Sequence, residues 1–122
     1  ADHLEEHGYA VVDEFLSSDA VATMRSEAAA LLAGGHMMPS QSTRYDEESG
    51  TVVAYEKNNV LSTNLRGGEA YHLSPRMHEY CVALVSSLAP RLNVRLSGVD
   101  LSDTLHANKL AVCLGDGSRY DK

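Results

Sequence analysis

The chain has 122 residues and a formal net charge of −7, and 43% of its residues are hydrophobic, which is enough for one domain with its own core. Asp and Glu outnumber Lys and Arg by 17 to 10, and this acidic balance argues against nucleic acid as the main partner. No run of about 18 apolar residues predicts a membrane span, and no positively charged segment leads into an apolar one as in a signal peptide.

The beginning of the chain predicts a helical turn, a strand and a long helix. Residues 3–7 are polar and favour a helical turn, and Tyr9–Phe15 (YAVVDEF) is rich in residues that favour strands. Ser17 or Ser18 then offers an N-cap for a helix over residues 17–35, which a pair of glycines ends. Apolar residues recur along this helix at helical spacing, namely Val21, Met24, Ala28, Leu31 and Leu32.

The middle of the chain carries weaker signals. Residues 36–50 are polar and rich in turn-forming residues, which predicts a loop. Thr51–Tyr55 (TVVAY) predicts a short strand. Asn58-Asn59 is expected to turn the chain into another short piece around Val60.

A second helix is predicted over residues 74–89. Ser74 suits the N-cap and Pro75 the first helical position, while Pro90 is expected to end or kink the helix. Alternating apolar residues over Leu92–Leu96 favour a short extended piece. The apolar stripe of the helix consists of Met77, Cys81, Leu84, Val85 and Leu88.

The end of the chain predicts a strand, a tight turn and the start of a return strand. Thr104–Leu114 is the longest strand candidate, and the apolar character of its second half suits a strand covered on both faces. Gly115–Gly117 (GDG) is a turn signal.

No glycine-rich βαβ unit occurs, so a dinucleotide-binding fold is excluded. The order of elements predicts an α+β domain with helices supporting one face of a sheet.

The two cysteines bear on the cellular compartment. Cys81 and Cys113 both lie in apolar patterns and are expected to be buried free thiols. The sequence offers neither a disulfide framework nor CxxC-type zinc spacing. This usage favours a reducing compartment, the cytoplasm or the nucleus.

Three segments resemble, in order, the N-terminal half of prolyl-4-hydroxylase-type Fe(II)/2-oxoglutarate-dependent dioxygenases. Gly8–Leu16 with its serine-capped helix is similar to the family's opening, Pro75–Leu88 to its second supporting helix, and Lys109–Lys122 to its first core strand and the turn before the metal. The resemblance implies that residues 1–122 are the N-terminal portion of one oxygenase domain. It also implies a double-stranded β-helix, or jelly roll, with two supporting helices and a core strand starting at about 104–122.

The resemblance further implies an activity and a site. Such enzymes hydroxylate prolyl residues of a protein or peptide, using Fe(II) in a 2-His-1-carboxylate triad, 2-oxoglutarate as cosubstrate and ascorbate. Tyr120 matches the tyrosine of the Tyr-x-x-His-x-Asp pattern, so the metal ligands are expected just after Lys122 and none is assigned within the chain. Cys113 occupies a position where the family often has a second pocket tyrosine. Ala111 and Lys109 are expected on the same face of that strand. The segment alone is therefore predicted to be inactive until the remaining sequence of the domain completes it.

Two alternatives stay open. Residues 1–61 hold 11 acidic and 3 basic residues, and a non-enzymatic binding module or pseudo-oxygenase would use the acidic stretch 36–50 to contact a partner. A more remote alternative is a zinc peptidase, because His3, Glu6 and His7 fit the H-x-x-E-H pattern. Against zinc, that segment is short and ends at Gly8.

Overall fold

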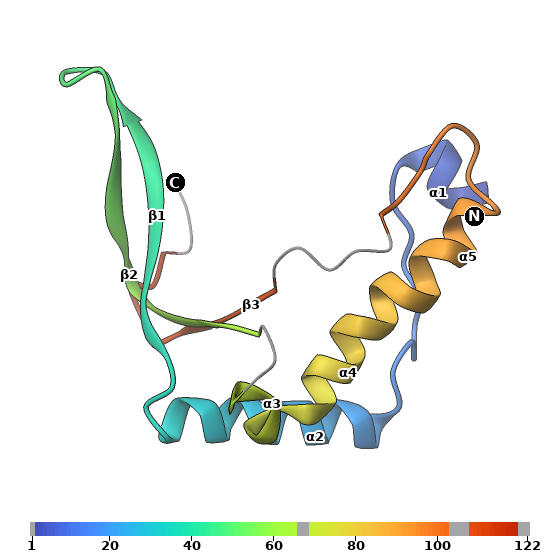
Figure 1. Cartoon of the computed structure of the whole chain (residues 1–122), viewed down its shortest axis with the longest axis horizontal. Coiled ribbons are helices and arrows are strands. Elements are labelled where there is room, and N and C mark those ends of the chain that lie inside the picture. The colour runs from blue at the N-terminus through green and yellow to red at the C-terminus, as the bar shows by residue number, and fades with distance from the viewer. Residues whose placement is uncertain (1, 66–68, 103–107, 120–122) are drawn as a thin grey trace.

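The computed structural model describes residues 2–65, 69–102 and 108–119. The chain is α+β, with one three-stranded antiparallel sheet in the order β1-β2-β3 and helices packed against it (Figure 1). The elements in chain order are α1 (Asp2–His7), α2 (Ser18–Ala33), β1 (Met38–Asp46), β2 (Thr51–Asn64), α3 (Glu69–Leu73), α4 (Pro75–Ala83), the π-helical segment η1 (Leu84–Leu88), α5 (Ala89–Asn93) and β3 (Lys109–Cys113). None of the helices in these ranges is long and apolar enough to cross a membrane.

Helix α2 forms as the sequence predicts. Ser17 is its N-cap in extended conformation, and its Oγ accepts a hydrogen bond from the N–H of Ala20 at 3.2 Å. At the other end the N–H of Gly34 donates to the carbonyl oxygen of Ala30, and Gly35 has φ 71°, a value that L-residues rarely adopt. Local capping chemistry therefore determines both ends of this helix.

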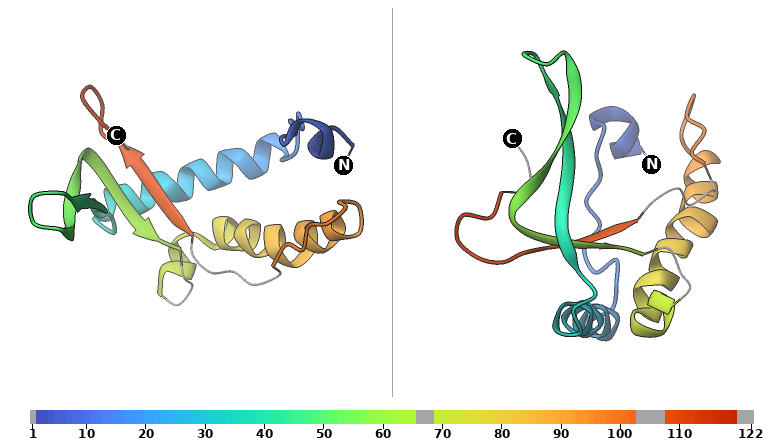
Figure 2. Two further views of the ribbon diagram at one scale, coloured as in Figure 1. Left: turned by 90° about the horizontal axis from the view of Figure 1, so that it is seen from above. Right: turned by 60° about the vertical axis from the view of Figure 1, so that its left-hand side comes forward.

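The prediction of a loop over residues 36–50 is wrong, because strand β1 occupies most of this segment. β1 and β2 form an antiparallel hairpin that projects from the rest of the molecule (Figures 1 and 2). At the tip, Asp46 accepts from the N–H of Ser49 through Oδ2 at 3.1 Å and from the N–H of Gly50 through its carbonyl oxygen at 2.9 Å. β1 (MPSQSTRYD) is polar on both faces and mostly exposed, so it lacks the apolar alternation by which strands are recognised in sequences.

Strand β2 is longer than predicted and contains the Asn58-Asn59 pair. The pairing of β1 with β2 shifts register between Pro39 and Gln41, whose partners are Leu61 and Glu56. Asn59 lies within the extra residues of β2 and has φ 52°, in the left-handed region that asparagine tolerates better than most residues. The expected turn is therefore a bulge that bends one continuous strand.

The core lies between the sheet, α2 and α4. Its buried residues are Leu31, Met37, Leu65 and Met77. Figure 2 shows α2 and α4 on the same side of the sheet. The partly buried residues packed against this core are Met24, Ala28, Leu32, Leu61, Cys81, Leu110 and Val112. The chain is thus α+β, as the sequence predicts, and α2 and α4 pack at the β2–β3 end of the sheet.

The second helix continues past Pro90, so of the two outcomes expected there, an end or a kink, the end does not occur. The π-helical segment η1 precedes the proline, and the N–H of Ala89 donates to the carbonyl oxygen of Leu84. Pro90 has no N–H and its ring would crowd the preceding turn of a regular α-helix, so the wider π turn accommodates it. The expected extended piece at Leu92–Leu96 is wrong, because Leu92 belongs to α5 and the following residues form turns.

The predicted strand at Tyr9–Phe15 does not form. This segment connects α1 to α2 without regular structure, and Val11 and Val12 are 78% and 64% exposed. β-propensity describes the fit of a side chain on a sheet surface. Among the described residues no strand pairs with this segment, so its composition alone does not make it a strand.

Candidate functional site

The candidate site is built on β3 and the turn that follows it. β3 pairs antiparallel with the second half of β2, with Val60 opposite Cys113, Ser62 opposite Ala111 and Asn64 opposite Lys109. The prediction of a strand from Thr104 to Leu114 is correct for Lys109–Cys113, while residues 103–107 lie outside the described ranges. The sheet thus holds β3 beside the bulged strand β2.

Side chains along β3 separate onto two faces. Leu110 and Val112 pack against the core, so Lys109, Ala111 and Cys113 lie on the opposite face by the two-residue period of a strand. The structure therefore brings three of the four candidate residues onto one face. The fourth, Tyr120, lies outside the described residues.

The expectation that both cysteines are buried is wrong for Cys113. Cys113 is exposed at the end of β3, and Cys81 is half-buried against the core. Burial raises the pKa of the Cys81 thiol above its ordinary value. Cys113 is therefore the more accessible thiol, in keeping with its place on the face of β3 away from the helices.

The Gly115–Gly117 turn is docked on the Asn58-Asn59 bulge of β2. The side-chain amide of Asn58 donates to the carbonyl oxygen of Gly117 at 2.7 Å, and that of Asn59 donates to the carbonyl oxygen of Asp116 at 3.4 Å. Gly115 and Gly117 have φ of 113° and 80°, conformations that need glycine. Two turn signals of the sequence thus contact each other, through residue pairs that are 59 and 57 positions apart in the chain.

The backbone around the turn is tied to the same bulge. The carbonyl oxygen of Asn59 accepts from the N–H of Leu114 and from the Oγ of Ser118, both at 2.9 Å. The N–H of Arg119 donates to the carbonyl oxygen of Asn58 at 3.0 Å. Ser118 and Arg119 are not in a strand, so the expected return strand is absent up to Arg119, but the direction in which the chain leaves the turn is fixed.

Asn58 and Asn59 are the residues of this site that sequence reasoning missed. Their pattern indicates a turn, and nothing local shows that they bind a second turn so far along the chain. Ser40 of β1, completely buried, lies at the same register shift. Its Oγ has no hydrogen-bond partner among the described residues.

The described residues do not form a metal centre. Within residues 2–65, 69–102 and 108–119, no group of three or more His, Cys, Asp or Glu side chains could hold a metal ion. The rings of His3 and His7 are tilted by 57° with their centroids 4.3 Å apart, and Oε2 of Glu6 lies 3.6 Å from Nε2 of His7. They lie on a six-residue helix that buries none of its residues. Glu79, the distant acid that could complete a zinc set, instead pairs with Arg76 at 2.9 Å. We assign no step of a metal-dependent reaction to these residues.

Comparison with models of protein families, with curated proteins and with solved structures finds no match to this chain.

Proposed function

We propose that this chain is the leading part of an Fe(II)/2-oxoglutarate-dependent oxygenase domain of the jelly-roll type. The observation that carries the proposal is the docked turn, because the resemblance makes Gly115–Gly117 the last turn before the metal-binding residues. A turn that delivers metal ligands must leave its strand in a fixed direction. The amides of Asn58 and Asn59 and the backbone around them provide that constraint.

The proposed activity is hydroxylation of a prolyl residue in a protein or peptide. The reaction consumes O₂ and 2-oxoglutarate, places one oxygen atom in the C–H bond of the prolyl ring, and releases succinate and CO₂. Iron and 2-oxoglutarate supply this chemistry when bound. We assign the binding of neither group to the described residues. Their proposed part is to support the pocket and to set the direction of the chain after the turn.

Residues on the open face of β3 have proposed roles in the pocket. Cys113 offers a small thiol where relatives of this type often carry a tyrosine hydroxyl, so any hydrogen bond made by that hydroxyl is lost. Ala111 leaves space beside it, and Lys109 reaches from the far end of the strand toward solvent. Tyr120 is proposed to line the same pocket.

Metal binding tests the proposal at the level of the 122-residue chain. We expect no stoichiometric binding of Mn(II), used as a redox-stable substitute for Fe(II), in the presence of 2-oxoglutarate, because the ligands are proposed to follow Lys122. A longer chain that includes the residues after Lys122 is expected to bind one Mn(II) and to form succinate. Tight binding by the 122 residues alone contradicts this placement of the site.

A second candidate function is a binding module without catalysis. The β1–β2 hairpin, which projects from the rest of the molecule (Figure 1), favours it. Glu47 and Glu48 at its tip are exposed and form an acidic end suited to a basic partner. Substituting Glu47 and Glu48 by Gln distinguishes an oxygenase from a binding module. An oxygenase is expected to keep its rate of succinate formation, whereas a binding module loses its affinity for the partner.

A further inference from the structure

The outer edge of β3 is open in the described part of the chain. Leu114 and Leu65 donate their N–H groups to Asn59 and Asn108 across the β2–β3 pair. The alternation of an antiparallel ladder then directs the N–H and C=O groups of Leu110 and Val112 toward β2. Those of Lys109, Ala111 and Cys113 point away from it and form a row of donors and acceptors without a strand partner in residues 2–65, 69–102 and 108–119.

The two edges of the sheet differ in character. β1 carries polar residues along most of its length and Pro39 near its start, which are features that discourage pairing at an edge. β3 (KLAVC) is apolar at four of its five positions. Of the two edges, β3 is the one suited to receive another strand.

An apolar groove continues from this edge. It has a volume of about 530 Å³ and lies between α2 and α4 beside Leu110, with Met24, Met77, Tyr80 and Leu84 among its lining residues. A strand added to β3 would direct every second side chain over this groove, on the face where Leu110 already points. Main-chain pairing and side-chain burial are thus available to the same ligand, as in β-strand addition.

Charge indicates what kind of strand fits. Arg25 and Lys109 are the charged residues among those that line the groove, in a chain whose net charge is −7. A fitting strand combines apolar residues with acidic ones. Tyr9–Phe15 (YAVVDEF) has this composition, with Asp13 and Glu14 among residues that favour strands.

The Tyr9–Phe15 segment is exposed where it lies. Its side chains Tyr9, Val11, Val12 and Phe15 are between 51% and 78% exposed. Glu14 has φ 52°, an uncommon value for a residue other than glycine, and an extended strand would remove it. The segment thus has apolar surface to bury and a local conformation that pairing would relax.

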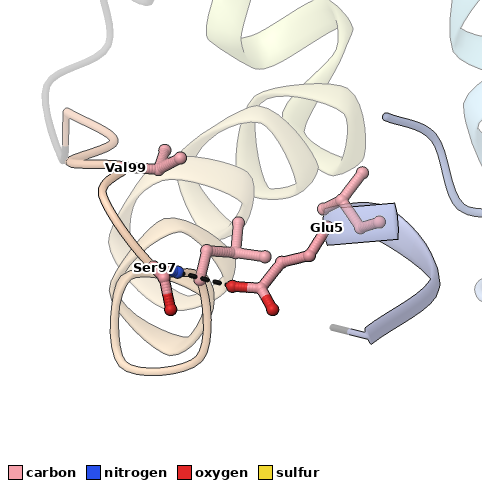
Figure 3. A pocket seen from close by; sticks show the side chains of 5 residues that line it. Glu5, Ser97 and Val99 are labelled. Carbon is pink, nitrogen blue, oxygen red and sulfur yellow. Dashed lines mark hydrogen bonds between the residues drawn. The ribbon is translucent and has the colours of Figure 1, made fainter. Parts of the chain in front are cut away.

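Both ends of this segment are held within its own copy. At one end the Oε1 of Glu5 in α1 accepts from the N–H of Ser97 at 2.6 Å, next to Leu4 and Val99 (Figure 3). At the other end Ser17 caps α2. Among the described residues the segment does not pair with its own β3, so the partner considered for it is the edge of a second copy.

We propose that Tyr9–Phe15 of one copy of this chain pairs with the outer edge of β3 in a second copy. Asp13 and Glu14 alternate between the two faces of the added strand, one toward Arg25 on the groove side and the other toward the face that carries the Lys109 side chain. A two-fold axis makes the contact reciprocal, so each copy donates one strand and receives one.

Sedimentation velocity of the 122-residue chain tests the proposal. A concentration-dependent species of twice the 13.2 kDa monomer mass is expected. Ala111→Pro removes an outward N–H that β2 does not use, so this variant is expected to remain monomeric. The matched control Ala111→Val keeps the N–H and is expected to dimerise.

A charge exchange provides a second set of variants, which leaves every backbone N–H of β3 in place. Asp13→Lys with Glu14→Lys is expected to raise the dissociation constant about tenfold or more. Mixing that chain with an Arg25→Glu, Lys109→Glu chain is expected to restore a mixed dimer, even if Ala111→Pro fails to fold. A chain that stays monomeric at every concentration overturns the proposal. This holds whether the outer edge of β3 is then unpaired or pairs with Tyr9–Phe15 of the same copy. A dimer that both sets of substitutions leave unchanged overturns it as well.

Discussion

Glu27 of α2 caps the N-terminus of α4 through the backbone of Met77. Its Oε2 accepts from the N–H of Met77 and its Oε1 from the N–H of Arg76, both at 2.9 Å. The residue expected as N-cap, Ser74, makes no capping hydrogen bond with its side chain, and its Oγ lies 3.2 Å from Nδ1 of His78. A carboxylate from one helix thus satisfies donors at the start of another and favours the positive end of its dipole, which joins the two helices that support the sheet.

Replacing Glu27 tests this link between α2 and α4. We expect Glu27→Ala to lower the free energy of unfolding by about 1–2 kcal/mol, because two helix-terminal N–H groups lose a charged acceptor. Urea unfolding followed by circular dichroism measures the change. Glu79→Ala is the control, since its pair with Arg76 is half-exposed and should contribute no more than about 0.5 kcal/mol. Equal effects of the two substitutions would contradict the capping role.

Helices were predictable from the sequence because their signals are local. Ser17, the glycine pair at 34–35 and the apolar stripe of α2 all lie within the helix or next to it. The cap of α4 was not predictable, because Glu27 is 50 residues from Met77 along the chain and no local pattern connects them.

Strands were predicted poorly because a strand needs a partner. The polar segment β1 became a strand through its pairing with β2, although its sequence indicates a loop. Tyr9–Phe15 has the composition of a strand and is exposed without pairing among the described residues. In the candidate site, the sequence predicted the turn at Gly115–Gly117, and it predicted a turn at Asn58-Asn59 where the structure has a bulge. It did not predict that Asn58 binds Gly117.

Asn58 tests how firmly the turn is held. Asn58→Ala removes the donor to the Gly117 carbonyl and is expected to cost about 0.5–1 kcal/mol in unfolding free energy. Asn58→Asp is expected to cost more, because it places a carboxylate oxygen beside a carbonyl oxygen that now accepts a 2.7 Å hydrogen bond. Hydrogen exchange of the Arg119 N–H, bonded to the Asn58 carbonyl, should accelerate in both variants. If Asp is tolerated better than Ala, the assigned hydrogen bond is wrong.

The hairpin tip should depend on pH through Asp46. Hydrogen bonds from the side chain and backbone of Ser49 lower the pKa of Asp46 from its ordinary value of 3.8. The pKa of Asp46 is lower in the folded state than in the unfolded state. The stabilisation that its charged carboxylate gives is therefore fully present above the unfolded-state pKa and is lost as the pH falls through the folded-state pKa. An NMR titration of the Asp46 carboxyl is expected to show a midpoint below 3.8, and Ser49→Ala should move it upward. A midpoint at or above that value in the unmodified chain contradicts the assignment.

The two cysteines should differ in reactivity. Iodoacetamide is expected to modify the exposed Cys113 about tenfold faster than Cys81, because burial raises the pKa of the Cys81 thiol and limits access to it. Peptide mass spectrometry of partly alkylated protein measures both rates. In a Cys113→Ser variant the remaining rate isolates Cys81, and the midpoint of its pH dependence should lie above the ordinary thiol pKa. Equal rates would place Cys113 in a covered position.

The central proposal is that Gly115–Gly117 leads into the iron site of an oxygenase. The most direct measurement is Fe(II)-dependent conversion of 2-oxoglutarate to succinate by the protein carrying the residues after Lys122, with a prolyl peptide as substrate. The proposal predicts succinate in step with hydroxyprolyl product, and loss of both when a His-x-Asp motif following Lys122 is substituted. Absence of such a motif, or a protein that binds no Mn(II) and forms no succinate, would contradict it.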